Sequence, residues 1–280
     1  MNKLRRVIIF RAAVAGGVAM ALSCAAAADA QAAPAGPVRG VDISAYQHTG
    51  AAINWRQVAR DGIRFVSVKA SEGTYYRNPF YASDTRAAAA AGLVVLPYVF
   101  ANPAQSGGTP TARFAVSVTG RRGPASLPLV VDLENDPYKK KAECYGLSQP
   151  KMTAWIGGFL NQARALTGRW PVIYTTASWW QQCTGATGRF RDSPLWLAAF
   201  GPPSPPIPSP WHRWAFWQYA DNGKLAGIGQ VDLDYYQPTD GLPALHAAAR
   251  KAQARPRKAR ATPHEAQARN KPAASKPARR

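Results

Sequence analysis

Short apolar runs alternate with segments of helical spacing along the middle of the chain. Each run is five to eight residues long and rich in Val, Ile, Leu and aromatic residues, as is typical of buried β-strands. We predict eight strands, at residues 39–43, 65–69, 93–100, 127–133, 171–175, 195–199, 214–219 and 231–235.

Helical patterns fill the gaps between the first strands, and capping residues mark their ends. Asn, Ser or Pro stands where a helix would begin, and Gly stands where it would stop. The five expected helices follow Asn54, run from Asn78 to Gly92, begin at Pro110, run from Ser148 to Gly168, and cover residues 177–183. The later stretch GPPSPPIPSP cannot be helical and predicts a stiff loop.

This alternation predicts an α/β fold. Repeated βα units favour parallel strands with right-handed crossovers, and eight such strands favour a closed barrel. Helices are few after the fifth unit, so we expect an irregular TIM-like barrel of about five βα units followed by three strands, in a domain at residues 38–245. The apolar content of 46% is sufficient for such a core.

The run LPLVVDLEND delivers two carboxylates, Asp132 and Glu134, separated by one residue. Side chains of a strand alternate between its faces, so both acids point the same way while Leu133 points into the packing. Two neighbouring carboxyls cannot both ionise freely. One can serve as a general acid while the other stays anionic, as glycoside hydrolysis requires. An isolated pair of this kind is also compatible with a strand that enters an acidic turn.

Further acids fall near the ends of other predicted strands. The active site of a parallel barrel lies where the carboxyl ends of its strands gather, so acids distant in the sequence can converge there. The acids in such positions are Asp42 in the first strand, Glu72 just past the second, and Asp232 with Asp234 in the eighth.

The first 30 residues predict a cleaved export signal. Basic residues precede an apolar, Ala-rich stretch, and Ala28-Asp29-Ala30 offers a cleavage site of small residues. A retained membrane anchor and lipid attachment at Cys24 are the alternatives, although Ala21 matches the lipid-attachment pattern poorly. We therefore expect a secreted or periplasmic protein.

The net charge of +20 is concentrated at the C-terminus. Residues 250–280 contain eleven Lys and Arg against one Glu, a net charge of +10. No large apolar residue follows Leu245, so we expect residues 246–280 to form a disordered basic tail. Such a polycation can bind anionic polymers of the cell envelope, or serve only as a solubilising spacer. No basic helix interleaved with aromatics accompanies it, so we expect no sequence-specific nucleic-acid binding.

The remaining cysteines, Cys144 and Cys183, form an even pair, which predicts a disulfide in an exported chain. The four histidines show no metal-ligand spacing, so no metal site is predicted.

Ordered motifs across residues 38–240 resemble one family. They are GVDISAYQ, VKASEG, PYVFANP, VVDLE, CYGLS, TGRWPVIYTTASWWQQCTG, PLWLAAF, WAFWQYA and GQVDLDYY. In this order they resemble the Chalaropsis-type lysozymes, glycoside hydrolase family 25.

The resemblance implies an N-acetylmuramidase that cleaves the β-1,4 bond between N-acetylmuramic acid and N-acetylglucosamine in peptidoglycan. By that likeness Glu134 matches the general acid, and Asp132, Asp42 and Asp232 match the other active-site acids. Val99 departs from the family, many members of which have His there. On this reading, a polar contact in the cleft is lost.

Asp132 lies too close to Glu134 on the same face to act as the base on the opposite side of the sugar. We therefore expect substrate assistance, in which the muramic 2-acetamido oxygen attacks the anomeric carbon while Asp132 steadies its N–H. Acid catalysis and acetamido participation both proceed without a cofactor, so we expect none. We also expect a monomer.

Aromatic residues at strand ends are candidates for sugar stacking, although most rings must belong to the core. The candidate substrate contacts are Tyr98, Trp217, Tyr219, Tyr46 and Glu72. Glu72 could equally be a structural hydrogen-bond acceptor, and Asp234 is expected to brace a loop. A chitinase-like hydrolase and a non-catalytic wall-binding protein are the alternative functions.

Overall fold

The computed structural model describes residues 37–48, 50, 52–120, 127–139, 142–201 and 203–237. The predicted export signal with Cys24, the end of the predicted domain and the basic tail lie outside these residues. In chain order the elements are β1 (Val38–Ile43), the 3-10 helix η1 (Ala45–His48), α1 (Trp55–Arg60), β2 (Phe65–Glu72), β3 (Tyr76–Arg77), α2 (Tyr81–Ala90), β4 (Val94–Phe100), α3 (Gly108–Thr119), β5 (Val130–Asp132), α4 (Gln149–Thr167), β6 (Val172–Thr175), α5 (Ala177–Thr184), the 3-10 helix η2 (Gly188–Phe190), β7 (Leu195–Ala198), β8 (Phe216–Leu225) and β9 (Gly229–Tyr236).

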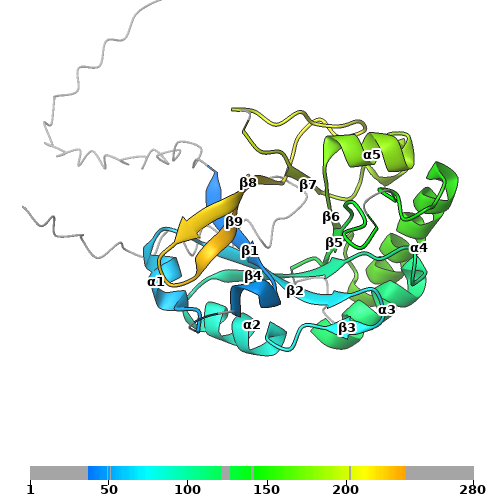
Figure 1. Ribbon diagram of the computed structural model, residues 1–280. Helices are drawn as coiled ribbons and strands as arrows, with labels where there is room; N and C mark the ends of the chain where they lie inside the picture. Colours follow the sequence, from blue (N-terminus) through cyan, green and yellow to red (C-terminus); the bar gives the residue numbers. More distant parts are fainter. Residues whose placement is uncertain are drawn as a thin grey trace, which may run out of the picture. The chain divides into compact units, whose positions relative to one another are not determined.

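Eight strands close into a barrel, as predicted. They follow one another in the order β1, β2, β4, β5, β6, β7, β8, β9, and β9 pairs with β1 to complete the ring. The short β3 pairs only with the end of β2. Figure 1 shows the α-helices around the outside of the strands, with α1 beside the turn end of the β8–β9 hairpin.

The direction of the last strand differs from the prediction. All pairs from β1 to β8 in the ring are parallel, but β9 runs antiparallel to both β8 and β1. The reason is the connection: a tight hairpin joins β8 to β9 at Gly227 (φ 90°), whereas a parallel pair would require a long crossover. The start of β9 therefore lies at the rim where the other strands end.

The five expected helices are present. Their caps and apolar spacing are local features of the sequence, and these features determine where the helices begin and end. The Asn54 side chain accepts a hydrogen bond from the Gln57 amide at the start of α1. Helix α4 begins after Ser148 and stops at Gly168, which adopts the left-handed conformation (φ 74°). Its buried residues recur with helical spacing, at Met152, Trp155, Ile156, Phe159, Leu160 and Ala163.

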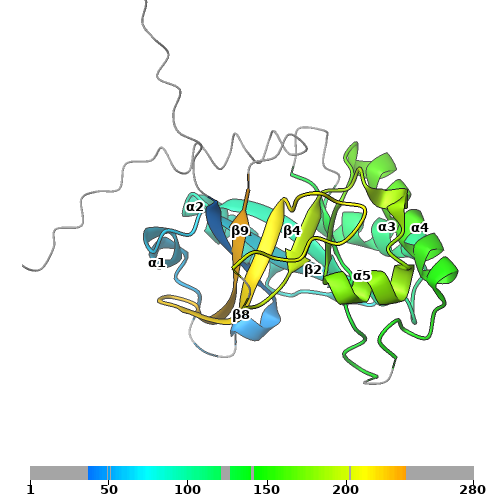
Figure 2. The same cartoon turned by 90° about the horizontal axis from the view of Figure 1, so that it is seen from above.

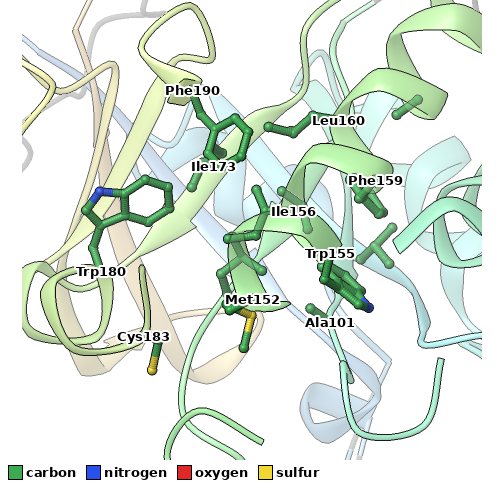
Figure 3. Close-up of a cluster of buried hydrophobic side chains, with 14 of the residues drawn as sticks. Ala101, Met152, Trp155, Ile156, Phe159, Leu160, Ile173, Trp180, Cys183 and Phe190 are labelled. Atoms are coloured by element: carbon green, nitrogen blue, oxygen red, sulfur yellow. The ribbon is translucent and has the colours of Figure 1, made fainter. Parts of the chain in front are cut away.

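Three apolar clusters surround or fill the barrel. The largest lies between α3, α4, α5 and the outer faces of β4 to β7, and Figure 3 shows α4 inserting Ile156 and Phe159 into it. A second cluster lies under α1 and α2, which Figure 2 shows on the opposite side from α3 and α4. The third fills the barrel interior. There Gly40 is necessary, because a Cβ at this position would collide with the Phe65 ring.

The predicted disulfide is present. Cys144 and Cys183 are bonded, with their Cα atoms 5.3 Å apart, and they connect the segment after β5 to α5. Closing a loop of this length stabilises a fold by about 4 kcal/mol in the chain-entropy model.

Candidate active site

Strand alternation divides each barrel strand between the interior and the outer layers. Val130, Val172 and Trp196 belong to the interior cluster, whereas their neighbours Val131 and Ile173 pack under the helices. Interior positions near the carboxyl ends of the parallel strands are polar rather than apolar, and they surround a cavity of about 310 Å³. Its lining side chains include Asp42, Lys69, Tyr98, Asp132, Glu134, Tyr174, Trp196, Gln218 and Asp232.

The four acids expected to act together converge on this cavity. Asp42 of β1 stands directly opposite Asp232 of β9 in the antiparallel register. Asp132 ends β5, and Glu134 follows two residues later on the same side. Asp132 reaches the cavity as expected, at the carboxyl end of a parallel strand. Asp232 lies at the same rim for a different reason, because the antiparallel β9 begins there.

Burial raises the pKa of every acid in the group, and repulsion from neighbouring carboxylates adds to it at Asp132, Glu134 and Asp232. Burial and then the charge of Asp42 raise the pKa of Glu134 to about 7, although Lys69 acts in the opposite direction. Burial, helped by Asp42, raises the pKa of Asp232 to about 8, and burial raises that of Asp42 to about 6. Burial and the neighbouring Glu134 raise the pKa of Asp132 well above its ordinary value. The cluster therefore retains protons near neutral pH, as general acid catalysis requires.

Asp132 also offers a free acceptor. Its Oδ1 atom is buried, and within the described part of the chain it has no hydrogen-bond partner. Buried carboxylate oxygens normally have partners, so this atom is suited to accept a hydrogen bond from a bound molecule.

Lys69 is the cation that lines the cavity, and Glu72 holds it in place. The Lys69 ammonium lies over the Phe100 ring, 4.6 Å from its centroid, and donates a 2.8 Å hydrogen bond to Glu72. Glu72 also accepts hydrogen bonds from the hydroxyls of Tyr75 and Tyr138. Burial alone would raise the pKa of Glu72, but these bonds outweigh it and hold the pKa below its usual value. Glu72 does not line the cavity, so its carboxylate acts on the site through Lys69.

Two uncharged side chains complete the cavity wall. Tyr174 donates from its hydroxyl to Gln218 Oε1, and Gln218 Nε2 donates to Asp42 Oδ2, both over 2.8 Å. Behind them, the buried Asp234 accepts a hydrogen bond from the Trp196 indole. The acid expected to brace a loop therefore lies beside the catalytic candidates.

Comparison with known proteins identifies this arrangement. The sequence matches the family described as Glycosyl hydrolases family 25 over residues 41–228. The chain belongs to glycosyl hydrolase family 25.

Relatives in this family extend over most of the described chain. The chain is 40% identical over 203 residues to Lysozyme M1 of Streptomyces globisporus, which covers 71% of this chain and 67% of that protein. It is 36% identical over 191 residues to the N,O-diacetylmuramidase of Chalaropsis sp, covering 66% and 88% of the two chains. The crystal structure of the bacterial lysozyme from Streptomyces coelicolor is similar with a TM-score of 0.69 and 37% identity, covering 77% and 98%. These findings confirm the family resemblance and the enzyme class, a glycoside hydrolase.

Two of the expected substrate contacts line the cavity. Tyr98 of β4 points into the barrel interior, where the acids lie. Tyr46 is 81% exposed on η1, at the rim. The η1 segment is held in turn by His48, which stacks on Phe80 and makes a 2.8 Å contact with Asp84 of α2.

Trp217 and Tyr219 were expected on the cavity and do not line it. They alternate with Gln218 along β8, so when Gln218 points inward they point to the outer face. There Trp217 donates to the Ala199 carbonyl, and Tyr219 stacks on Tyr235 with centroids 4.4 Å apart. The same alternation corrects the expectation for Val99: it is fully buried under the helices between Tyr98 and Phe100, so its identity removes no contact from the cavity.

Sequence reasoning missed Lys69, Tyr174, Trp196 and Gln218. For two of them the signal is register: Asp132, Tyr174 and Trp196 are paired across β5, β6 and β7, so their side chains share the inner face.

No helix within the described ranges is long and apolar enough to cross a membrane. Among the same residues, no group of three or more His, Cys, Asp or Glu side chains is arranged to hold a metal ion.

Proposed function

We propose that this protein is a lysozyme that hydrolyses the β-1,4 bond between N-acetylmuramic acid and N-acetylglucosamine in peptidoglycan. Relatives named as a lysozyme and an N,O-diacetylmuramidase support this substrate class. The observation that carries the proposal is Glu134, a carboxyl on the cavity with a pKa of about 7 among three further acids.

Glu134 is the general acid in this scheme. Below about pH 7 its carboxyl is protonated, and it can transfer that proton to the glycosidic oxygen as the bond to the anomeric carbon breaks. The departing sugar leaves with a new hydroxyl, and Glu134 becomes a carboxylate.

The attacking group is the 2-acetamido oxygen of the muramic residue. The partnerless Oδ1 of Asp132 accepts the acetamido N–H and turns the carbonyl oxygen toward the anomeric carbon. The resulting cyclic intermediate is opened by water, which gives its proton to the Glu134 carboxylate. Two displacements at one carbon retain its configuration. At neutral pH Asp42, with a pKa of about 6, holds negative charge near the cationic intermediate, whereas Asp232, with a pKa of about 8, keeps its proton.

Substrate contacts follow from the cavity lining. Tyr98 in the wall and Tyr46 at the rim present rings to the sugars. The disulfide is stable in an oxidising compartment, which fits an exported enzyme, and peptidoglycan lies outside the cytoplasmic membrane.

The test uses purified peptidoglycan with the wild type and the Glu134→Gln variant. After digestion, new reducing ends are reduced with borohydride and identified by mass spectrometry. Reduced muramic acid ends made only by the wild type are expected. Reduced glucosamine ends, or equal cleavage by both proteins, would contradict the proposal, and chitin digestion provides the control for a chitinase.

The stereochemistry is tested separately. Proton NMR of the first product, recorded before mutarotation, should show the β-anomer. An α-anomer would exclude acetamido participation while leaving the bond specificity intact.

A further inference from the structure

A chain of hydrogen bonds fixes the orientation of the Asp42 carboxyl. Gln218 is 4% exposed, and its amide oxygen accepts from the Tyr174 hydroxyl. This bond leaves the amide nitrogen directed at Asp42 Oδ2, 2.8 Å away. The three side chains come from β6, β8 and β1, so the arrangement depends on closure of the barrel.

On its other side Asp42 meets a second acid. Asp234 is fully buried, stands opposite Gln218 in the β8–β9 register, and is close enough to Asp42 for the two carboxyls to affect each other's pKa. Burial and the charge of Asp42 raise the pKa of Asp234 well above its ordinary value, so this pair of neighbouring buried carboxyls retains a proton. The Trp196 indole donates to Asp234 at 3.2 Å, and the Gln218 amide donates to Asp42, so each acid has its own external donor.

Several charged or titratable groups face Asp42 from the elements around it. They are Asp232 and Asp234 on β9, Lys69 on β2, Tyr98 on β4, and Asp132 and Glu134 at the end of β5. Among these, Glu134 and Asp232 respond to Asp42 as their strongest charged neighbour. A negative charge on Asp42 favours the protonated form of Glu134.

We propose that Gln218 and Tyr174 are positioning residues that hold Asp42 as the anionic member of the Asp42–Asp234 pair, and so keep Glu134 protonated for catalysis. Gln218 stabilises the anion by direct donation. Tyr174 acts one step further away, by preventing the Gln218 amide from rotating its oxygen toward Asp42. The inference deepens the proposed function, because it rests on Glu134 as the acid.

The test is the pH dependence of kcat/KM on peptidoglycan for Gln218→Met and Tyr174→Phe. Gln218→Met keeps the shape but removes the donor, so Asp42 takes up a proton and Glu134 loses one more easily. The alkaline limb of the profile should move down by about one pH unit. Tyr174→Phe should move it in the same direction by a smaller amount. Tyr219→Phe, on the same strand but facing outward, is the matched control and should leave the limb in place.

Gln218→Glu separates positioning from simple packing. A protonated Glu at this position can donate to Asp42 as the amide does, whereas an ionised one repels it. This variant should approach wild-type activity at acidic pH and lose activity steeply as the pH rises. Thermal melting at the assay pH identifies variants that merely unfold.

The outcomes are distinguishable from failure of the proposed function. If the wild type releases no muramic ends, the function itself is wrong. If the wild type is active and depends on Glu134, but Gln218→Met and Tyr174→Phe lower activity without moving the alkaline limb, the positioning role is wrong.

Discussion

At the scale of single residues, the active-site acids work against the stability of the fold. Burial raises the pKa of Glu134 to about 7, against about 4.3 for an unfolded chain. A group whose pKa is raised on folding favours the folded state at low pH, and that contribution is lost as the pH rises through the folded pKa. Wild-type stability should therefore fall between about pH 4 and pH 7 through this residue.

Glu134→Gln removes this pH dependence together with the catalytic proton. At pH 8 the variant should be more stable than the wild type by about 2 kcal/mol, allowing for solvent screening, and at pH 4 the two should be alike. Urea denaturation at both pH values measures the difference. Asp192→Asn, at an exposed carboxyl, is the control. Equal stability of Glu134→Gln and the wild type at pH 8 would contradict this prediction, because it would show that ionisation of Glu134 does not lower the free energy of unfolding.

At the scale of elements, Glu72 joins three segments of the chain. Its carboxylate binds Lys69 within β2, Tyr75 before β3, and Tyr138 in the segment after β5. The bonds lower the pKa of Glu72, so their stabilising effect is present above about pH 4.3 and is lost as the pH falls through the lower folded value.

Glu72→Gln should destabilise the fold by about 2 kcal/mol at pH 7, with a smaller effect near pH 3. Because Glu72 acts through Lys69, we expect kcat to fall several-fold with little change in KM. Steady-state kinetics and urea denaturation measure both effects, and Tyr138→Phe, which removes one of the three donors, should produce a smaller loss. A rise in KM alone would instead restore the direct substrate contact first expected of Glu72.

The sequence predicts elements better than it predicts which residues meet. Caps such as Asn54 and Gly168 act locally, so the helices could be predicted from short windows. The direction of β9 could not, because it depends on the connection at Gly227 rather than on the strand's own residues. The side-chain direction of Trp217 depends on which face of β8 points into the barrel. Aromatic residues stand on both faces of this strand, so the sequence alone does not decide which face is the inner one.

The same limit applies to the cavity. The acids could be predicted because the active site of a parallel barrel lies at its strand ends, and because the family motifs contain them. Tyr174 and Gln218 could not, because Tyr and Gln are common in strands and their meaning comes from hydrogen bonds across three strands.

At the scale of the whole molecule, charge separates the catalytic domain from the tail. Residues 250–280 carry a net charge of +10, half of the total of +20. The substrate proposed for the barrel is embedded in an anionic envelope, so a cationic segment would raise the local concentration of enzyme without contacting the scissile bond.

Deletion after residue 245 should therefore separate wall binding from hydrolysis. The shortened chain should cleave soluble glycan fragments at the wild-type rate, but it should sediment less with intact cell walls. Wild-type binding should weaken steeply between about 0.05 and 0.5 M salt, because screening shortens the range of the attraction, whereas the shortened chain should respond little. A full-length variant with the tail's Lys and Arg replaced by Gln distinguishes charge from length. If it sediments as the wild type does, the tail acts as a spacer, and wall binding belongs to the barrel itself.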